Sequence, residues 1–162
     1  MTRPQGIALG LGAASVLLLL GVLGFQYLGR LPPCELCLWQ RWPHVGAAVV
    51  GLGGPLLIRF RLVERGTIRG IAALAALLIA LSGAVGVYHA GVEWHWWPGP
   101  QSCTGPAFRF TGAPLDLNAP VVMCDRAAWR LFGLSLAGYN ALISFALAGA
   151  AALMLARSGR KT

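Results

Sequence analysis

The chain has four cysteines, and their spacing divides them into two pairs. Cys34 and Cys37 form a Cys-x-x-Cys motif, whereas Cys103 and Cys124 lie at the two ends of a segment rich in proline. Two thiols separated by two residues can close a small disulfide ring, and a thiolate exchanges with another disulfide through a mixed disulfide. These residue types and spacings therefore indicate thiol–disulfide redox chemistry.

The Cys-x-x-Cys motif is expected at the start of a helix, since Pro32 and Pro33 precede it and an apolar segment follows. A helix N-terminus lowers the pKa of a nearby thiol, and the thiolate is the attacking species. If the helix is regular at Cys37, Arg41 lies one turn later on the same face. Its cation would suit an anionic partner such as a reduced quinone oxygen. A simpler role for Arg41 is to extend to the lipid–water interface.

The elements that must hold these cysteines are membrane-spanning helices. Hydrophobic residues make up 57% of the chain and charged residues only 11%, which excludes an ordinary soluble domain. Four apolar stretches approach the roughly 20 residues that a helix needs to cross a bilayer. The second contains two prolines and is extended back to the cysteine motif. We predict an all-α membrane protein, a four-transmembrane-helix bundle in a single domain (1–162), with spans at about 6–28, 36–58, 70–92 and 132–156.

The first apolar stretch has a second interpretation, as a secretory signal preceded by Arg3. Residues 7–25 exceed the usual signal core of about 7 to 15 residues, and no small-residue cleavage motif follows before Arg30. We therefore predict a retained span.

The distribution of Lys and Arg predicts the orientation, because cytoplasmic segments carry more of them. One side would hold Arg3, Arg59, Arg61, Arg65, Arg69, Arg157, Arg160 and Lys161. The other would hold Arg30, Arg41, Arg109, Arg126 and Arg130. The first group is larger, so we predict that both termini are cytoplasmic and that the cysteines face the periplasm. Disulfides form and persist in that compartment.

The net charge of +8 does not point to a nucleic-acid partner, because the basic residues are split among short segments with no continuous stripe. Topology and anionic lipid explain them better. One long periplasmic loop, about residues 93–130, connects the third and fourth spans. It is rich in proline and glycine, so no long helix is expected there. Such a loop suits thiol exchange with a soluble protein. Electrons would then pass to the Cys-x-x-Cys pair, provided that the loop moves toward the membrane, and from there to a lipid-soluble quinone.

Two other roles for the cysteines stay open on this evidence. Four cysteines can form a tetrahedral zinc site, but such sites usually combine two Cys-x-x-Cys units, whereas Cys103 and Cys124 are far apart. Two inert disulfides in a membrane scaffold or transport subunit are the second possibility. We predict a redox role and no metal site.

Three segments resemble the DsbB-type disulfide bond formation proteins, and the resemblance extends over nearly the whole chain. They are PCELCLWQRWPH around the motif, YHAGVEWHWWPGPQSC before the loop, and CDRAAWRLFGLSLAGYNALIS after it. The glycine- and proline-rich GVEWHWWPGP and the loop between the last two cysteines differ from the enterobacterial pattern, so the chain looks like a divergent branch. Vitamin K epoxide reductase-like proteins are the runner-up enzyme class, but there the loop pair precedes the Cys-x-x-Cys.

The resemblance implies a role for each cysteine. Cys34 and Cys37 match the pair next to the quinone, with Cys37 as the thiolate that contacts the quinone ring. Cys103 matches the cysteine that engages a periplasmic DsbA-like partner of thioredoxin fold, and Cys124 the cysteine that pairs with it at rest.

The resemblance also implies the cofactor and the residues that bind it. Arg41 matches an arginine implicated in quinone binding, and His89 a histidine near the quinone. The expected enzyme is a thiol:quinone oxidoreductase of the bacterial inner membrane that uses ubiquinone and supports disulfide bond formation. Glu93 and His95 could serve as proton relays, but we interpret them as interface residues. We expect Tyr139 and Asn140 to bond between helices.

Overall fold

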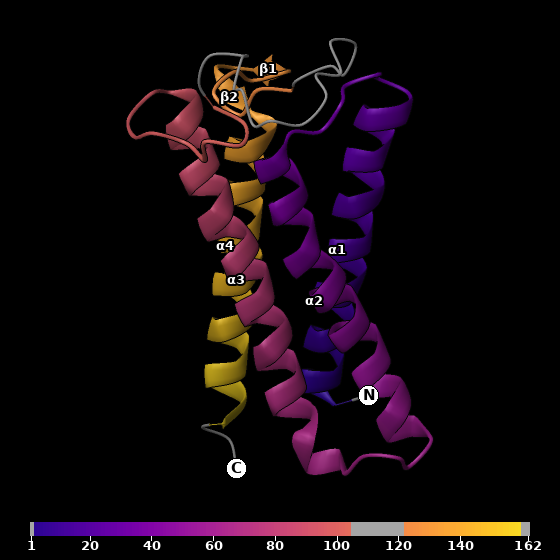
Figure 1. Cartoon of the computed structure of the whole chain (residues 1–162). Coiled ribbons are helices and arrows are strands. Elements are labelled where there is room, and N and C mark those ends of the chain that lie inside the picture. The colour runs from indigo at the N-terminus through magenta and orange to yellow at the C-terminus, as the bar shows by residue number, and fades with distance from the viewer. Residues whose placement is uncertain (1, 105–121, 160–162) are drawn as a thin grey trace.

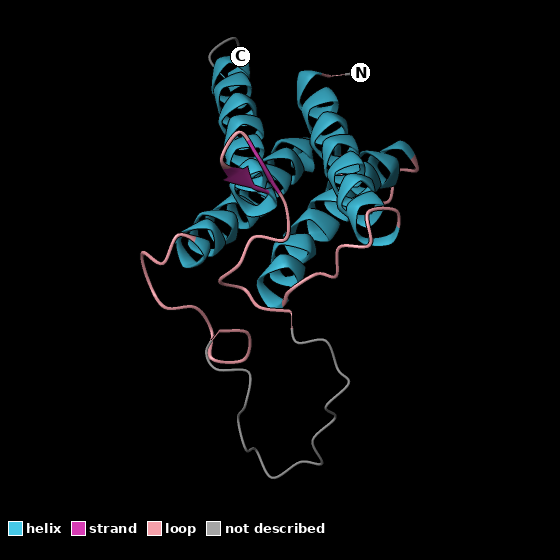
Figure 2. Cartoon of the chain, turned by 90° about the horizontal axis from the view of Figure 1, so that it is seen from above, coloured by secondary structure: helices cyan, strands magenta, loops and turns pink. Residues whose placement is uncertain are grey.

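The structure is a computed structural model that describes residues 2–104 and 122–159. Four long helices run side by side in one bundle (Figure 1). Their bounds are Arg3–Tyr27 for α1, Glu35–Arg59 for α2, Ile68–Glu93 for α3 and Leu136–Gly159 for α4. Viewed from above (Figure 2), the strands among the described residues form only one small hairpin beside these helices.

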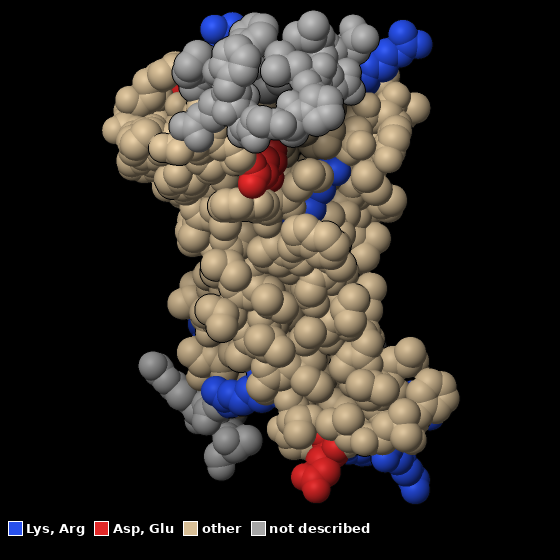
Figure 3. All heavy atoms as spheres, in the orientation of Figure 1, with Lys and Arg blue, Asp and Glu red and all other residues tan. Residues whose placement is uncertain are grey.

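Three helical segments are long and apolar enough to cross a membrane. They are α1, α4, and α3 with the short 3-10 turn η1 (Arg65–Thr67) that precedes it. This confirms the predicted class of helical membrane protein. Helix α2 is equally long at 25 residues, but it is less apolar and contains Pro43 and Pro55. The charged side chains visible in Figure 3 gather toward the two ends of the bundle, and a wide belt without them lies between.

Helix α1 begins and α4 ends at one end of the bundle, whereas α2 begins and α3 ends at the other (Figure 1), where the cluster of the four cysteines lies. The cysteine end carries the connection of residues 28–34 between α1 and α2 and the segment that follows α3. The opposite end carries the connection between α2 and α3, which includes η1. The helices therefore alternate in direction, as short connections between neighbours require.

A two-residue hairpin precedes α4. Strand β1 (Arg130–Leu131) pairs antiparallel with strand β2 (Leu134–Ser135), and Phe132 and Gly133 form the turn with φ values of 49° and 83°. Positive φ at both central positions is the geometry that joins tightly paired antiparallel strands. The helix consequently begins at Leu136, four residues after the start of the expected span at 132.

Small residues allow the helices to approach closely. Helix α2 packs on α1 and α3, and α3 packs on α4. Gly12 of α1 faces Gly51 of α2, and Gly86 of α3 faces Ala137 of α4. Close packing of this kind drives helix association in lipid, where apolar burial gives little advantage.

Asn140 joins three helices by hydrogen bonds. Its amide nitrogen donates to Gln40 Oε1 of α2 at 2.9 Å and to Ser82 of α3, while its Oδ1 lies 3.0 Å from His44 Nε2. The expected bonds of Asn140 between helices are thereby confirmed, whereas Tyr139 donates instead to Leu131 O of β1. Polar groups inside a membrane bundle need such partners, because the surrounding lipid supplies none.

A comparison of two glycines in α2 tests the close contact with α1. A Cβ at Gly51 would lie 2.6 Å from Ala8 O and 2.9 Å from Gly12 Cα, whereas a Cβ at Gly53 would meet nothing within 4 Å. We expect Gly51→Ala to lower the free energy of unfolding in detergent by about 1–3 kcal/mol, the usual cost of overpacking. Gly53→Ala should leave it unchanged or raise it by up to about 1 kcal/mol, because alanine favours helix. Equal effects in chemical denaturation would contradict the proposed contact.

Candidate functional site

The two cysteine pairs meet at one place. Cys103 and Cys124 are joined by a disulfide, whereas Cys34 and Cys37 are free thiols. Cys34, Cys103 and Cys124 pack in one buried cluster with Leu36 and Val92, and Cys37 and Val122 lie against it. Sequence reasoning required the loop to move toward the membrane. In the structure the loop disulfide already lies in the same buried cluster as Cys34.

The first turn of α2 determines how the two free thiols interact. Cys34 caps the helix in an extended conformation, and its Sγ accepts the Cys37 backbone N–H at 3.2 Å. The Cys34 thiol in turn donates to Cys37 Sγ at 2.8 Å. This hydrogen bond, together with burial, raises the pKa of Cys34 above its ordinary value. Because Cys34 holds its proton, the first negative charge of the reduced pair falls on Cys37.

His89 lies beside Cys34. It is buried in α3, and its Nε2 is 3.5 Å from Cys34 Sγ and 3.6 Å from Glu93 Oε1. Its Nδ1 is 2.8 Å from Gln40 Nε2. The structure therefore places this histidine next to the sulfur on the disulfide side, and it does not line the cavity described below.

Glu93 lies at the site, although sequence reasoning preferred an interface position for it to a proton-relay role. Its interpretation as an interface residue is wrong, because it is only 6% exposed and lies against His89. Its Oε2 has no hydrogen-bond partner among the described residues. His95, in contrast, is exposed and has a φ of 60°. The i, i+4 spacing of His89 and Glu93 was the available signal, since it places both on one helix face.

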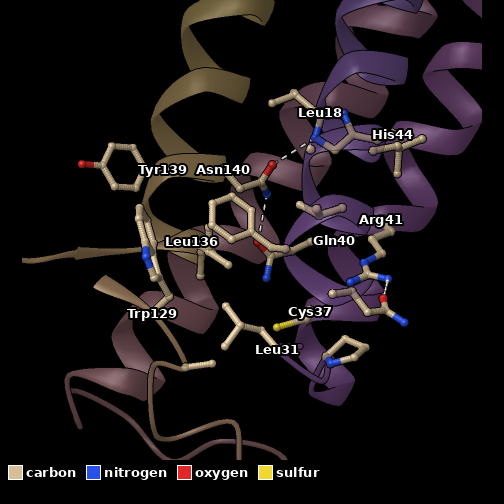
Figure 4. A pocket seen from close by; sticks show the side chains of 18 of the residues that line it. Leu18, Leu31, Cys37, Gln40, Arg41, His44, Trp129, Leu136, Tyr139 and Asn140 are labelled. Atoms are coloured by element: carbon tan, nitrogen blue, oxygen red, sulfur yellow. Dashed lines mark hydrogen bonds between the residues drawn. The ribbon is translucent and has the colours of Figure 1, made fainter. Parts of the chain in front are cut away.

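A cavity of about 340 Å³ opens between α1, α2 and α4 on the other side of the motif. Its walls are mostly apolar, and Cys37 and Arg41 both line it (Figure 4). The Arg41 guanidinium donates to Gln26 Oε1 of α1 at 2.7 Å. The size is that of a small-ligand pocket, and the one-turn spacing brings the cation and the sulfur to the same cavity.

Three further polar residues line this cavity, and sequence reasoning assigned none of them to a site. They are Gln40, His44 and Asn140. The Asn140 amide nitrogen donates to Gln40 and Ser82. Its Oδ1 can only accept, so His44 Nε2 donates the hydrogen bond to it. The signal was a pair of polar residues four apart, Gln40 and His44, just before the part of α2 that is apolar from Val45 to Ile58.

The four-cysteine zinc site weighed from the sequence is not formed, because Cys103 and Cys124 are bonded to each other. Across residues 2–104 and 122–159, one group has the spacing of metal ligands. Cys34 Sγ, Cys37 Sγ and a ring nitrogen of His89 all lie within 4.8 Å of one another.

Helices suited to a membrane, a free thiol pair beside an apolar cavity and a disulfide packed on that pair define a membrane thiol oxidoreductase. Residues 4–154 match the family described as "Disulfide bond formation protein DsbB". The chain belongs to this DsbB family, which confirms the resemblance read from its motifs and the predicted role in disulfide bond formation.

Similar proteins from three bacteria carry the same description. The chain is 31% identical to "Disulfide bond formation protein B" of Aromatoleum aromaticum, over 85% of this chain and 86% of that protein. It is 33% identical to "Disulfide bond formation protein B 2" of Pseudomonas aeruginosa strain PAO1, over 91% and 87%. It is 30% identical to the Verminephrobacter eiseniae protein, over 96% and 88%. No solved structure gives a significant match.

The packing of Cys124 against Cys34 can be tested by cross-linking. The double variant Cys37→Ser, Cys103→Ser leaves these two thiols, which are 5% exposed or less and share one cluster. We expect a Cys34–Cys124 disulfide to form on mild oxidation, because sulfurs within reach exchange without refolding. Mass spectrometry of proteolytic fragments would identify the linked peptides. The control Cys34→Ser, Cys103→Ser leaves Cys37, which faces the cavity, and should cross-link more slowly; equal rates would contradict the arrangement.

Proposed function

We propose that the protein reoxidises a reduced periplasmic DsbA-like thiol oxidase and passes the electrons to a membrane quinone, most directly ubiquinone. The observation that carries this proposal is the position of the free thiol pair. Cys34 shares a buried cluster with the loop disulfide, whereas Cys37 lines an apolar cavity between helices. The thiol pair thus has a protein disulfide on one side and, on the other, an apolar cavity suited to a quinone.

The first part of the reaction is thiol–disulfide exchange. A partner thiolate attacks Cys103, the Cys103–Cys124 bond breaks, and a mixed disulfide forms. The second partner thiol then releases the oxidised partner and leaves both loop thiols reduced. When Cys34 and Cys37 are joined as a disulfide, the loop thiols pass two electrons to them by the same exchange. The burial of Cys124 and Cys34 in one cluster supports this direct transfer.

The second part is quinone reduction. The Cys37 thiolate lies at the cavity wall, and the Arg41 cation lines the same cavity, where it would stabilise charge that develops on a quinone oxygen. Closing the Cys34–Cys37 disulfide from one thiol and one thiolate releases two electrons and one proton, and with a second proton taken up from water these convert quinone to quinol. The mostly apolar walls, open between the helices, suit a ring that arrives from the lipid.

We also propose that the cysteine end faces the periplasm and the termini face the cytoplasm. The placement of both termini and the Arg59-to-Arg69 connection at one end supports this orientation, because that end holds more basic residues than the other. An inner-membrane location follows, since disulfides persist only outside the cytoplasm.

Ultraviolet absorbance of ubiquinone tests the reaction, with the full-length protein in detergent and a reduced DsbA-like partner. We expect quinone consumption in the wild type and none above background in Cys37→Ser or Cys103→Ser. Arg41→Ala should raise the KM for quinone about tenfold, the effect of losing one charge-assisted hydrogen bond, and leave the KM for the partner unchanged.

Arg61→Ala is the matched control, because Arg61 is an exposed arginine at the opposite end of the bundle. It should behave as the wild type. If the two cysteine variants consume quinone at the wild-type rate, the proposed reaction is wrong. If Arg41→Ala and Arg61→Ala act alike, Arg41 has no part in quinone binding.

Labelling of intact bacterial cells tests the orientation. After reduction, a membrane-impermeant maleimide should label Cys103 and Cys124 without lysis of the cells. A cysteine introduced by Arg61→Cys, in a chain whose own cysteines are replaced by serine, should react only after lysis. Mass spectrometry or gel shift reports both results, and the opposite pattern would reverse the proposed orientation.

A further inference from the structure

We propose that the reduced form of this protein binds Zn²⁺ through Cys34, Cys37, His89 and Glu93, and that bound zinc blocks the thiol pair. The four side chains belong to the start of α2 and the last two turns of α3. Thiolate, imidazole and carboxylate are the ligands that Zn²⁺ prefers, and a set of four suits its tetrahedral geometry.

The distances in the metal-free protein already approach those of a zinc site. Zinc–ligand bonds of about 2.0 to 2.3 Å place tetrahedral ligand atoms about 3.4 to 3.8 Å apart. His89 Nε2 lies 3.5 Å from Cys34 Sγ and 3.6 Å from Glu93 Oε1. To fit this geometry the two sulfurs, now 2.8 Å apart, must separate by about 1 Å, and Glu93, which lies outside the close group of Cys34, Cys37 and His89, must shift toward them.

Glu93 provides independent evidence for a ligand at this place. It is 6% exposed, and its Oε2 has no hydrogen-bond partner among the described residues. A buried carboxylate oxygen without a partner is costly, and a cation would remove that cost. The three-group cluster of Cys34, Cys37 and His89 thus has a fourth oxygen ligand beside it.

Gln40 determines which ring nitrogen of His89 carries the proton. The Oε1 of Gln40 accepts from Asn140, and its amide nitrogen donates one hydrogen to Leu36 O. The other hydrogen of this nitrogen points to His89 Nδ1, which therefore accepts. In the metal-free protein the imidazole proton therefore sits on Nε2. Zinc at Nε2 moves this proton to Nδ1, where it needs an acceptor. A half-turn of the Gln40 amide supplies one, at the expense of its present hydrogen bonds.

Zinc and catalysis exclude each other at this site. A zinc thiolate cannot donate electrons while both sulfurs are ligands, and the closed Cys34–Cys37 disulfide has no thiolate to offer the metal. The proposed inhibition rests on the function assigned to this pair above. The binding itself does not, so it is measured without partner protein or quinone.

Cobalt spectroscopy tests the site directly. The full-length protein is reduced with a phosphine, freed of reductant without air and titrated with Co²⁺. We expect one equivalent to bind with the visible bands of a tetrahedral cobalt thiolate, and Zn²⁺ to abolish them. Protein with both disulfides closed should show no bands. Cys103→Ser with Cys124→Ser should keep them, since neither residue is a proposed ligand.

Substitutions then identify the remaining ligands. His89→Ala and Glu93→Gln should each weaken cobalt binding at least about tenfold. Glu35→Gln is the matched control, a carboxylate at the same end of the bundle that accepts a hydrogen bond from Ser102, and it should have no effect. Gln40→Glu should strengthen binding, because a carboxylate accepts the Nδ1 proton without the half-turn. A purely structural role for Gln40 predicts no such gain.

Alkylation of the wild type is the measurement that needs no variant. Zn²⁺ should protect Cys34 and Cys37 from a maleimide and leave the reduced Cys103 and Cys124 reactive. The proposal is wrong if no tetrahedral cobalt bands form, if oxidised protein gives the same bands, if His89→Ala binds cobalt as the wild type does, or if zinc protects no thiol. None of these outcomes depends on whether the protein reduces quinone.

Discussion

The packing of the loop disulfide and Cys34 into one buried cluster constrains the rest of the molecule. Electrons must pass between two sulfur pairs in different connections, so both pairs must be held within bonding reach at one end of the bundle. Cys34 meets this requirement by capping α2 inside a buried cluster that also contains Cys103 and Cys124. Because the cap fixes Cys34, the next turn of α2 directs Cys37 and Arg41 toward the cavity. The first turn of α2 therefore places Cys34 on the side of the loop disulfide and Cys37 on the side of the cavity.

A network of neutral polar groups supports this arrangement inside the bundle. Asn140 and Gln40 join α2 and α4, and Gln40 also orients His89 beside Cys34. Such hydrogen bonds are retained in lipid because no water replaces them. Gln40 and Asn140 also line the cavity. The positions of His89 beside Cys34 and of the cavity wall beside Cys37 therefore depend on the same two side-chain amides.

The neighbourhood of Cys34 has a second consequence. A buried thiol pair with a histidine and an unpaired carboxylate is open to electron exchange when it cycles, and to metal capture when it stays reduced. The two uses compete for the same sulfur atoms. Disulfide closure is therefore both the productive event and the protection against metal, which links the redox state of this pair to metal exposure.

The sequence by itself determined the class of fold, the redox chemistry and the family, because apolar length, cysteine spacing and motif order are local properties of the chain. The one-turn relation of Cys37 and Arg41 is also local, since helix periodicity gives it. Only the tertiary structure decided that Cys34 shares a buried cluster with the loop disulfide, that Glu93 is buried, and that Gln40, His44 and Asn140 line the cavity. These relations join segments up to 100 residues apart, and the packing of small residues between helices sets them. No local pattern specifies such packing.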